Sequence, residues 1–313
     1  MIYQKWKQCA LAVQGVDHVH SSVPCQDSVA NASGNGVHAI ALSDGGGSRK
    51  FSHVGSAAAT RAAAALMVEK FDDFYTRLGA ISRDGEKAER RLTRLRLEIL
   101  DAVLSEMRRE VTAECTLYDM GCTLQFAAVK DGRYIVGHVG DGVIAALYQR
   151  GISRTVEVLS HPENAGAPNV TFFVTDHDAK EHLRLSFGEC RQMEGILMMS
   201  DGPEEVLYGA ADGMHPNTMR LFDNFVGVRR EDYAAALKKF LSGSVAGVSY
   251  DDLSLNLLYL ETAEGARLSD AYREELFEGI VSTEQVVRVS SYAYLLDSSL
   301  SATREDDLSF LRC

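Results

Sequence analysis

Three short apolar segments separated by Asp-Gly dipeptides constrain the fold most strongly. Residues 122–129, 133–139 and 143–148 each have the length of a β-strand, and Asp131-Gly132 and Asp141-Gly142 stand between them. Asp-Gly dipeptides favour tight hairpin turns, and strands that are joined by hairpins are antiparallel. The sequence therefore predicts an antiparallel sheet in this part of the chain.

The remaining segments combine two long helical patterns with further short strands. Residues 52–75 are rich in alanine, and in residues 86–114 apolar side chains recur at helical spacing among many charges. Because these helices are grouped, and do not alternate with the strands, we predict an α+β fold with antiparallel sheet. Further strands are expected at 9–14, 37–42, 183–187, 195–199 and 253–260, and further helices at 203–208, 231–241 and 270–280.

The net charge of the chain restricts the kinds of partner that it can bind. Lys and Arg number 32 and Asp and Glu number 44 in 313 residues, so the formal net charge is −12. A field of this sign repels nucleic acid and anionic membranes, and we expect neither as a partner. A phosphate-bearing substrate would require a local reversal of charge, for which a bound metal ion is the obvious candidate.

No segment indicates export or membrane insertion. The N-terminus lacks the apolar core of a signal peptide, and no apolar run approaches the ~18 residues of a membrane span. The six cysteines are scattered and form no CxxC pair, which favours reduced thiols over a zinc cluster or a disulfide framework. We therefore expect a cytoplasmic protein.

Aspartate recurs where apolar strands end or begin, often next to glycine. One such turn is usually structural, because Asp and Gly are common turn residues. Several such turns together suggest a functional site. Strands that end at the same edge of a sheet bring their terminal side chains close together, and carboxylates at that distance repel one another. Divalent cations relieve that repulsion, and oxygen ligands favour Mg²⁺ or Mn²⁺. The segments are Gln26-Asp27, Ser43-Asp44-Gly45, Gly140-Asp141-Gly142, Ser200-Asp201-Gly202 and Tyr250-Asp251-Asp252.

The order of these segments resembles that of the metal-dependent phosphatases of the protein phosphatase 2C family, in their bacterial form. The resemblance spans residues 14–260 and rests on GVDHVHSSVPCQDS, IALSDGGGS, GCTL with GHVGDG, LMMSDGPEEV and YDDLSLNLLYL. The segment PNVTFFVT is also similar to one seen in bacterial members. The family resemblance implies a four-layer sandwich, in which helices flank two antiparallel β-sheets on both sides. It implies a catalytic domain at 1–261 and an extension of unknown role at 262–313.

The resemblance also implies a site for two ions of Mn²⁺ or Mg²⁺. Asp44 would bridge the two ions, and the Gly45 carbonyl would bind one of them. Asp201 and Asp251 would bind the first ion, whereas Asp27 would act beside Gln26, behind the ligands or through a water molecule.

Two further parts of the implied site involve alternatives or a weaker ion. Asp252 would replace Asp251 after a shift of one residue, and Asp306-Asp307 near the C-terminus echoes the same motif. The earlier block is preferred because it leads a long apolar strand. Asp141 and Glu205 match acidic positions that hold a third, weaker metal in the family.

The reaction implied by the resemblance is hydrolysis of phosphoserine and phosphothreonine in proteins. A water that bridges the two ions would attack phosphorus in line, with Asp27, Asp44, Asp201 and Asp251 as the catalytic residues. The partners implied are a phosphorylated protein and a cognate Ser/Thr kinase.

The sequence departs from the family pattern at two positions. Ser22 stands where many members have a phosphate-binding Arg, so Arg49 or Lys50 would have to replace it. Gly46 stands where many animal members have a His that is a candidate general acid, and His18 and His53 are the available substitutes.

These departures motivate one alternative, a pseudophosphatase of the same fold that binds or regulates a partner. A third and weaker alternative is an unrelated carboxylate-rich metal hydrolase of a small phosphomonoester. Retention of the acidic residues favours the enzyme, because a site freed from metal should lose carboxylates that repel one another.

Overall fold

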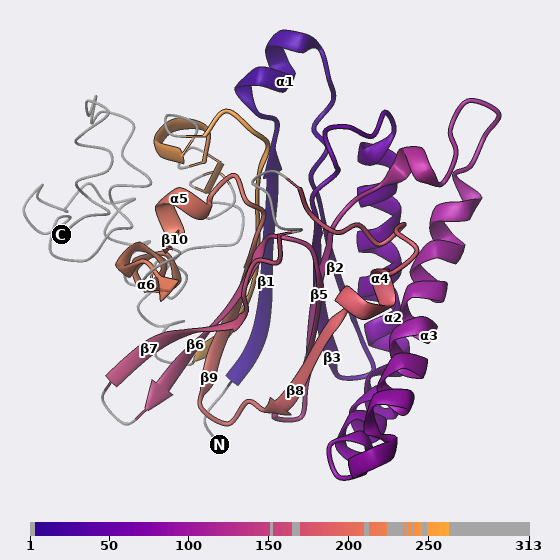
Figure 1. Ribbon diagram of the computed structural model, residues 1–313. Coiled ribbons are helices and arrows are strands. Elements are labelled where there is room, and N and C mark those ends of the chain that lie inside the picture. The colour runs from indigo at the N-terminus through magenta and orange to yellow at the C-terminus, as the bar shows by residue number, and fades with distance from the viewer. Residues whose placement is uncertain are drawn as a thin grey trace, which may run out of the picture.

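Two antiparallel five-stranded sheets stack face to face, with helices on both outer sides (Figure 1). The predicted α+β class and four-layer arrangement are confirmed. The structure is a computed structural model that describes residues 4–150, 153–164, 170–209, 213–223, 235, 237–238, 241–245 and 249–262.

The first sheet joins the two ends of the described chain. It has the order β1 (Gln4–Val13), β12 (Leu253–Thr262), β9 (Met193–Met199), β6 (Val143–Arg150) and β7 (Ser153–Ser160). The pairing of β1 with β12 runs in register from Gln4 opposite Thr262 to Val13 opposite Leu253. This register brings the end of β1 next to the start of β12, which the acidic segment Asp251-Asp252 directly precedes.

The second sheet contains the predicted hairpins. It has the order β2 (Ser28–Gly34), β3 (Val37–Ser43), β4 (Leu124–Lys130), β5 (Arg133–Val139) and β8 (Arg184–Glu189). A two-stranded ribbon, β10 (Tyr208–Gly209) with β11 (Gly213–Met214), lies apart from both sheets.

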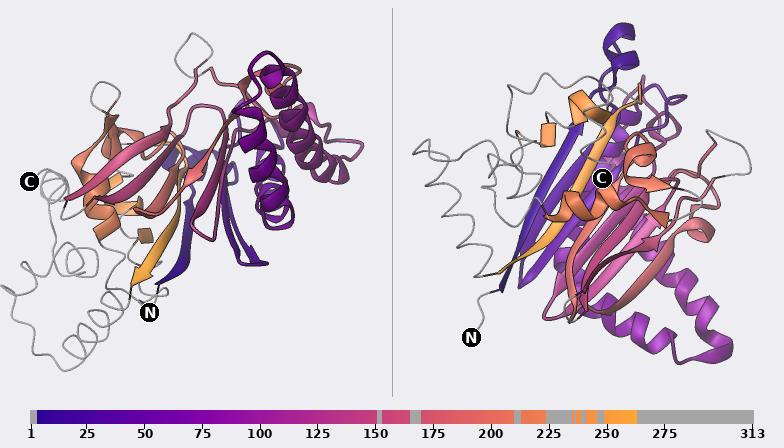
Figure 2. Two further views of the ribbon diagram at one scale, coloured as in Figure 1. Left: turned by 90° about the horizontal axis from the view of Figure 1, so that it is seen from below. Right: turned by 90° about the vertical axis from the view of Figure 1, so that its left-hand side faces the viewer.

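Two long helices and the short helix α4 (Ala179–His182) cover the second sheet, whereas α5 (Glu204–Leu207) and α6 (Pro216–Asp223) lie outside the first (Figure 2). The long pair is α2 (Ser52–Ile81) and α3 (Ala88–Arg109), which is shorter than the predicted 86–114. The short helices are α1 (Val16–Ser21), α4 (Ala179–His182), α5 (Glu204–Leu207) and α6 (Pro216–Asp223), with single turns at Gly85–Lys87, Tyr118–Met120 and Leu241–Val245. Most of the helix expected at 231–241, and all of 270–280, lies outside the described residues.

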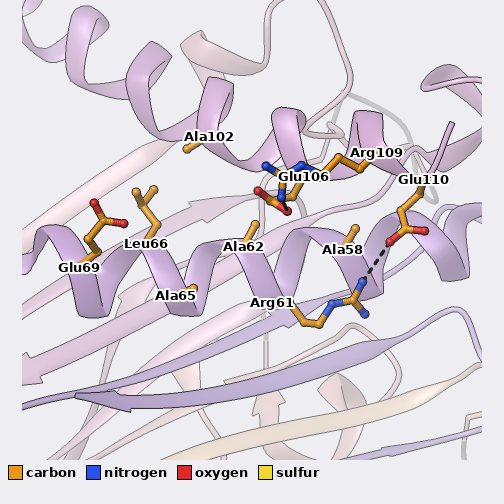
Figure 3. A pocket seen from close by; sticks show the side chains of 10 residues that line it. All are labelled: Ala58, Arg61, Ala62, Ala65, Leu66, Glu69, Ala102, Glu106, Arg109 and Glu110. Carbon is orange, nitrogen blue, oxygen red and sulfur yellow. Dashed lines mark hydrogen bonds and ion pairs between the residues drawn. The ribbon is translucent and has the colours of Figure 1, made fainter.

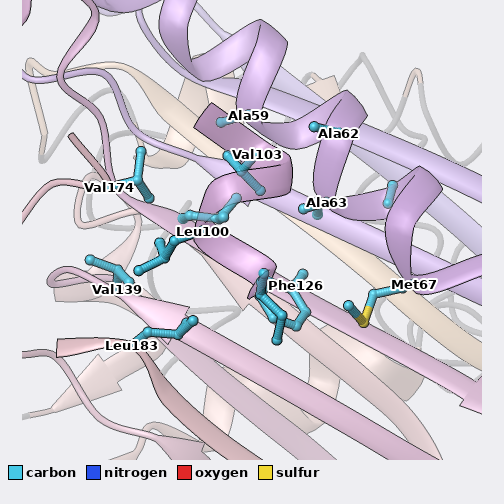
Figure 4. Packing of buried hydrophobic residues seen from close by; sticks show 14 of the residues in the cluster. Ala59, Ala62, Ala63, Met67, Leu100, Val103, Phe126, Val139, Val174 and Leu183 are labelled. Atoms are coloured by element: carbon cyan, nitrogen blue, oxygen red, sulfur yellow. The ribbon is translucent and has the colours of Figure 1, made fainter. Parts of the chain in front are cut away.

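Successive side chains along each strand point to opposite faces of the sheet, so the core is divided into layers. In β3, Ala39 and Ala41 pack against the α2 side, whereas Ile40 and Leu42 face the other sheet. The small side chains of β3 and of α2 let helix and sheet approach closely, and Phe126 and Met67 fill the space beside them (Figure 4). Apolar burial on this scale is the main stabilising contribution to the sandwich.

Buried amide side chains connect the two sheets. Asn256 on β12 donates from Nδ2 to the carbonyls of Ala30 at 3.2 Å and Ala41 at 2.9 Å. Gln125 on β4 donates to the carbonyl of Met199 on β9 at 2.7 Å. Because a polar group in the core is costly unless it is paired, these bonds favour one relative placement of the sheets. They lie next to the strand ends that carry the acidic turns.

The described residues contain no helix that is both long and apolar enough to cross a bilayer. The five cysteines among the described residues form no disulfide with one another.

Candidate active site

The acidic turns meet in one cavity at the end of the sandwich that carries α1. Asp44 directly follows β3, Asp141 lies in the turn between β5 and β6, Asp201 follows β9, and Asp251 precedes β12. The two sheets therefore contribute carboxylates from opposite walls. The cavity has a volume of about 310 Å³ and is lined by His18, Gln26, Asp44, Gly45, Gly46, Gly47, Ser48, Thr123, Asp141, Thr171, Phe173, Asp201 and Asp251.

Hydrogen bonds to a single threonine hold Asp44 in place. Thr123 donates from its backbone N–H to the Asp44 carbonyl at 2.8 Å and accepts from the Asp44 N–H through Oγ1 at 2.9 Å. At Gly45, a Cβ would lie 2.7 Å from the Gln26 carbonyl oxygen and 2.8 Å from Ser52 Cβ, so only glycine fits. Thr123 itself lies on the cavity wall and positions Asp44.

Asp27 is buried behind the cavity. It is 7% exposed, and neither of its carboxylate oxygens makes a hydrogen bond of good geometry. Burial raises the pKa of Asp27 to about 8; the charges of Asp252 and Asp201 add to the increase, and the hydroxyls of Ser254 and Ser200 oppose it. A buried carboxyl in this state is stabilised by a nearby cation.

The other carboxylates are perturbed in the same direction. Burial, followed by the charges of Asp27, Asp201, Asp141 and Asp251, holds the pKa of Asp44 well above its usual range. Burial also raises the pKa of Asp201 to about 6, and that of Asp141 is raised for the same reason. An oxygen-only set of crowded carboxylates fits a hard divalent cation such as Mg²⁺ or Mn²⁺.

Asp251 and Asp252 have different environments. Asp251 is exposed and lines the cavity. Asp252 is 3% exposed, and its carboxylate accepts hydrogen bonds from the backbone N–H groups of Gly15 at 2.7 Å and Gln26 at 2.5 Å. Asp252 therefore ties the segment after β1 to the start of β12, and Asp251 is the member of the pair that lines the cavity.

His18 adds an imidazole to the cavity wall. Its Nδ1 is buried and lies 2.9 Å from Oδ1 of Asp252, although the ring N–H is not directed for a hydrogen bond. Donor atoms of His18, Asp251 and Asp252 lie within 4.8 Å of one another. No described residue forms a hydrogen bond with Nε2, so this nitrogen is available to a ligand.

The structure accounts for the glycine at position 46. The ring of Phe173 packs on it so closely that a Cβ would lie 2.4 Å from Cζ. A histidine at position 46 would collide with this ring. Phe173 comes from the segment that the sequence singled out as PNVTFFVT, but its packing on Gly46 could not be read from the motif.

Four of the remaining candidates are described and do not line the cavity. Ser22 is exposed at the end of α1, where its φ is 57°. His53, Arg49 and Lys50 are also absent from the lining of this cavity. Glu205 lies in α5, but its side chain, like residues 305–307, is outside the described part of the protein.

A larger groove lies between α2 and α3 (Figure 3). Its volume is about 460 Å³, and alanines of α2 form much of its floor. The ionisable side chains there are all paired: Arg61 with Glu110 at 3.4 Å, Arg109 with Glu106 at 2.6 Å, and Glu69 with Lys70 at 3.2 Å. The groove therefore lacks the clustered unpaired groups that mark the acidic cavity.

Comparison with known proteins matches the chain to one family. The family model described as "Protein phosphatase 2C" matches residues 14–242. Comparison with curated protein sequences finds no match.

Solved structures share the fold at low sequence identity. A bacterial serine phosphatase has a TM-score of 0.52 at 14% identity, covering 82% of this chain and 98% of its own. The serine/threonine phosphatase Stp1 from Staphylococcus aureus scores 0.50 at 15% identity, with 83% and 95% coverage. A serine-threonine phosphatase 2C from Toxoplasma gondii scores 0.52 at 12% identity, with 82% and 95% coverage.

Proposed function

The chain belongs to the protein phosphatase 2C family, and on that premise we propose that it hydrolyses phosphoserine and phosphothreonine in proteins with Mn²⁺ or Mg²⁺. The observation that carries this proposal is the convergence of Asp44, Asp141, Asp201 and Asp251 on one cavity from four separate strand ends. A cytoplasmic location and a partner Ser/Thr kinase remain predictions from the sequence.

The residues present suit two ions. Asp44 and the Gly45 carbonyl would hold them together with Asp201 and Asp251, and Asp27 would support them from its buried position. Asp141 and Glu205 are the candidates for a third, weaker site. When bound, the ions supply an activated water and neutralise the phosphate.

His18 is the cavity residue best placed to complete the reaction. When the bond from phosphorus to the seryl or threonyl oxygen breaks, the leaving oxygen takes up a proton. The imidazolium of His18 would donate that proton from Nε2, while the buried carboxylate of Asp252 beside Nδ1 balances its charge. Solvent then returns a proton to Nε2 and resets the site.

Turnover in the presence and absence of metal tests this proposal. We expect the purified protein to hydrolyse p-nitrophenyl phosphate and a phosphothreonine peptide with Mn²⁺, and to lose both activities in excess EDTA. Restoration by Mn²⁺ excludes irreversible unfolding as the cause of the loss. Metal binding without any turnover would contradict the proposal.

The alternative is a pseudophosphatase, which Ser22 and the Phe173–Gly46 packing favour because they remove two catalytic positions of the family. Calorimetric titration with Mn²⁺, run beside the assay, separates the two. An enzyme binds two or more ions and turns over substrate, whereas a pseudophosphatase does not turn over substrate. An unrelated hydrolase of small phosphomonoesters would cleave p-nitrophenyl phosphate and leave the peptide intact.

A further inference from the structure

Two adjacent cations lie beside the acidic cavity without a carboxylate partner. Arg49 and Lys50 directly follow Ser48, which lines the cavity. Within the described part of the chain, neither side chain forms an ion pair, although the protein carries a net charge of −12. Both cations act electrostatically on Asp119, whose carboxylate already accepts hydrogen bonds from the Thr116 hydroxyl at 2.6 Å and the Thr116 backbone N–H at 2.9 Å.

Aromatic rings hold the Arg49 guanidinium in place. Its Cζ lies 3.6 Å from the centroid of the Tyr118 ring and 5.5 Å from that of Phe173, which is itself part of the cavity wall. Its stem packs on Gly121, where a Cβ would lie 2.9 Å from Cγ. Stacking on an aromatic face stabilises a cation and reduces the side-chain entropy that binding would otherwise cost.

Tyr118 makes this surface unusual for a protein exterior. Its side chain is 67% exposed even though it supports Arg49 on one face. Tyrosine and arginine are the residue types that contribute most binding energy at protein interfaces. A preordered arginine, a neighbouring lysine and an exposed tyrosine next to a cavity together suit an extended peptide that bears negative charge.

We propose that Arg49, Lys50 and Tyr118, which we call the basic rim, bind acidic residues that flank the phosphorylated residue of the substrate. This inference rests on the proposed phosphatase function and specifies its substrate class. None of the three side chains lines the cavity, so the phosphate itself binds inside, and the rim contacts the peptide outside it. The rim therefore acts on peptide affinity more than on the chemical step.

Charge explains why such a surface is needed. An acidic peptide is repelled by a protein of net charge −12, and complementary charges near the site would offset this repulsion and raise the association rate. Because Lys50 and Tyr118 are exposed to solvent and Arg49 is partly so, the attraction of the rim should weaken as salt screens it.

Matched peptides test the inference. One phosphothreonine peptide carries glutamates on both sides of the phosphorylated residue, and the other carries lysines at the same positions. We expect the wild-type protein with Mn²⁺ to favour the glutamate peptide about tenfold in kcat/KM, a preference that falls at high salt. The variants Lys50→Gln and Arg49→Gln should raise KM for the glutamate peptide several-fold and leave kcat, and the turnover of p-nitrophenyl phosphate, unchanged.

A matched control and a second readout keep the outcomes separate. Arg94→Gln removes the same charge from the exposed face of α3 and should change no parameter. Equal kcat/KM for the two peptides, or variants that behave like Arg94→Gln, would overturn the rim. Absence of p-nitrophenyl phosphate turnover would instead refute the proposed function. In that case, fluorescence anisotropy would measure binding of the unphosphorylated glutamate peptide to the rim. This binding should be lost in the Lys50→Gln variant.

Discussion

The two Asp-Gly turns at opposite ends of β5 carry the same dipeptide and have different environments. Asp131-Gly132 forms the hairpin between β4 and β5 with φ values of 48° and 73°, and the Asp131 side chain is 72% exposed. Asp141-Gly142 lies at the other end, where Asp141 lines the cavity and a Cβ on Gly142 would lie 1.8 Å from Gln125 Nε2. The first turn only reverses the chain, whereas the second presents a carboxylate to its neighbours.

The difference shows that an acidic turn becomes a site through its position in the sandwich. At the end near α1, turns from both sheets converge, and buried amides such as Gln125 and Asn256 hold the sheets in one relative placement. At the other end of β5, the exposed Asp131 carboxylate lies 3.7 Å from the Arg133 guanidinium. The local sequence of a turn does not distinguish these two cases.

The largest expected contrast is in turnover. Asp44→Asn and Asp201→Asn should each lower kcat for p-nitrophenyl phosphate with Mn²⁺ by at least about 10³-fold, because each removes a charged ligand where the ions would sit. Asp131→Asn removes the same charge at the other turn and should retain wild-type turnover. A strong loss of turnover in Asp131→Asn, or no loss in the two site variants, would contradict the assigned difference between the two turns.

The dependence of kcat on the leaving group tests whether His18 donates the proton. His18→Asn should lower kcat for a phosphothreonine peptide by about 10²-fold, because an alkoxide needs a proton as it leaves. It should lower kcat for p-nitrophenyl phosphate only slightly, since that leaving group is a stable anion. His20→Asn, an exposed position on the same helix, is the control. Equal losses on both substrates would assign His18 a structural role only.

Part of the fold and of the site can be predicted from local sequence patterns. The hairpins, the two long helices and the acidic residues next to apolar strands were predictable, because periodicity and turn chemistry are local. The strands β2 and β7 escaped prediction because SVANASG and SRTVEVLS contain few strongly apolar residues. Their pairing with β3 and β6 compensates for this weak local signal.

The finer parts of the site depend on contacts between distant residues. Strand alternation separates Asp251 from Asp252, but which of them faces the cavity depends on the positions of Gly15 and Gln26, more than 200 residues away. The packing of Phe173 on Gly46 and the double hydrogen bond of Thr123 to Asp44 are similarly long-range. The spacing of residues along the chain does not predict these contacts.

The pH dependence of stability should distinguish the two ends in metal-free protein. The pKa of Asp27 is about 8 when folded, against an ordinary 3.8, so the folded state holds this proton more tightly than the unfolded state. Stability is therefore fully present below about pH 4 and is lost as pH rises through about 8, with an effect on the order of a few kcal/mol. Chemical denaturation in EDTA should show this slope, and Asp27→Asn should flatten it.

The same experiment contains its control. Asp131→Asn should leave the slope unchanged because that side chain is exposed. Added Mn²⁺ should stabilise the wild-type protein more at pH 8 than at pH 5, since at pH 5 protons compete for the carboxylates. A stability that rises with pH between 4 and 8 in EDTA would contradict the assigned burial of Asp27.

The smallest contrast concerns the amides between the sheets. Asn256→Ala and Gln8→Ala each remove two donated hydrogen bonds, from Asn256 to Ala30 and Ala41 and from Gln8 to Ala32 and Ala39. Both should lower the free energy of unfolding by about 1–3 kcal/mol. Only Asn256→Ala, four residues from Asp252, should also weaken Mn²⁺ binding. Equal effects on Mn²⁺ affinity would mean that the sheets act as one rigid unit.

Anomalous diffraction from crystals grown with Mn²⁺ would locate each ion and its ligands in the acidic cavity without relying on activity. We expect two strong peaks in the cavity, within bonding distance of Asp44, Asp201 and Asp251, and none at Asp131. Peaks confined to other surfaces, with Asp44 and Asp201 unliganded at saturating Mn²⁺, would contradict this expectation.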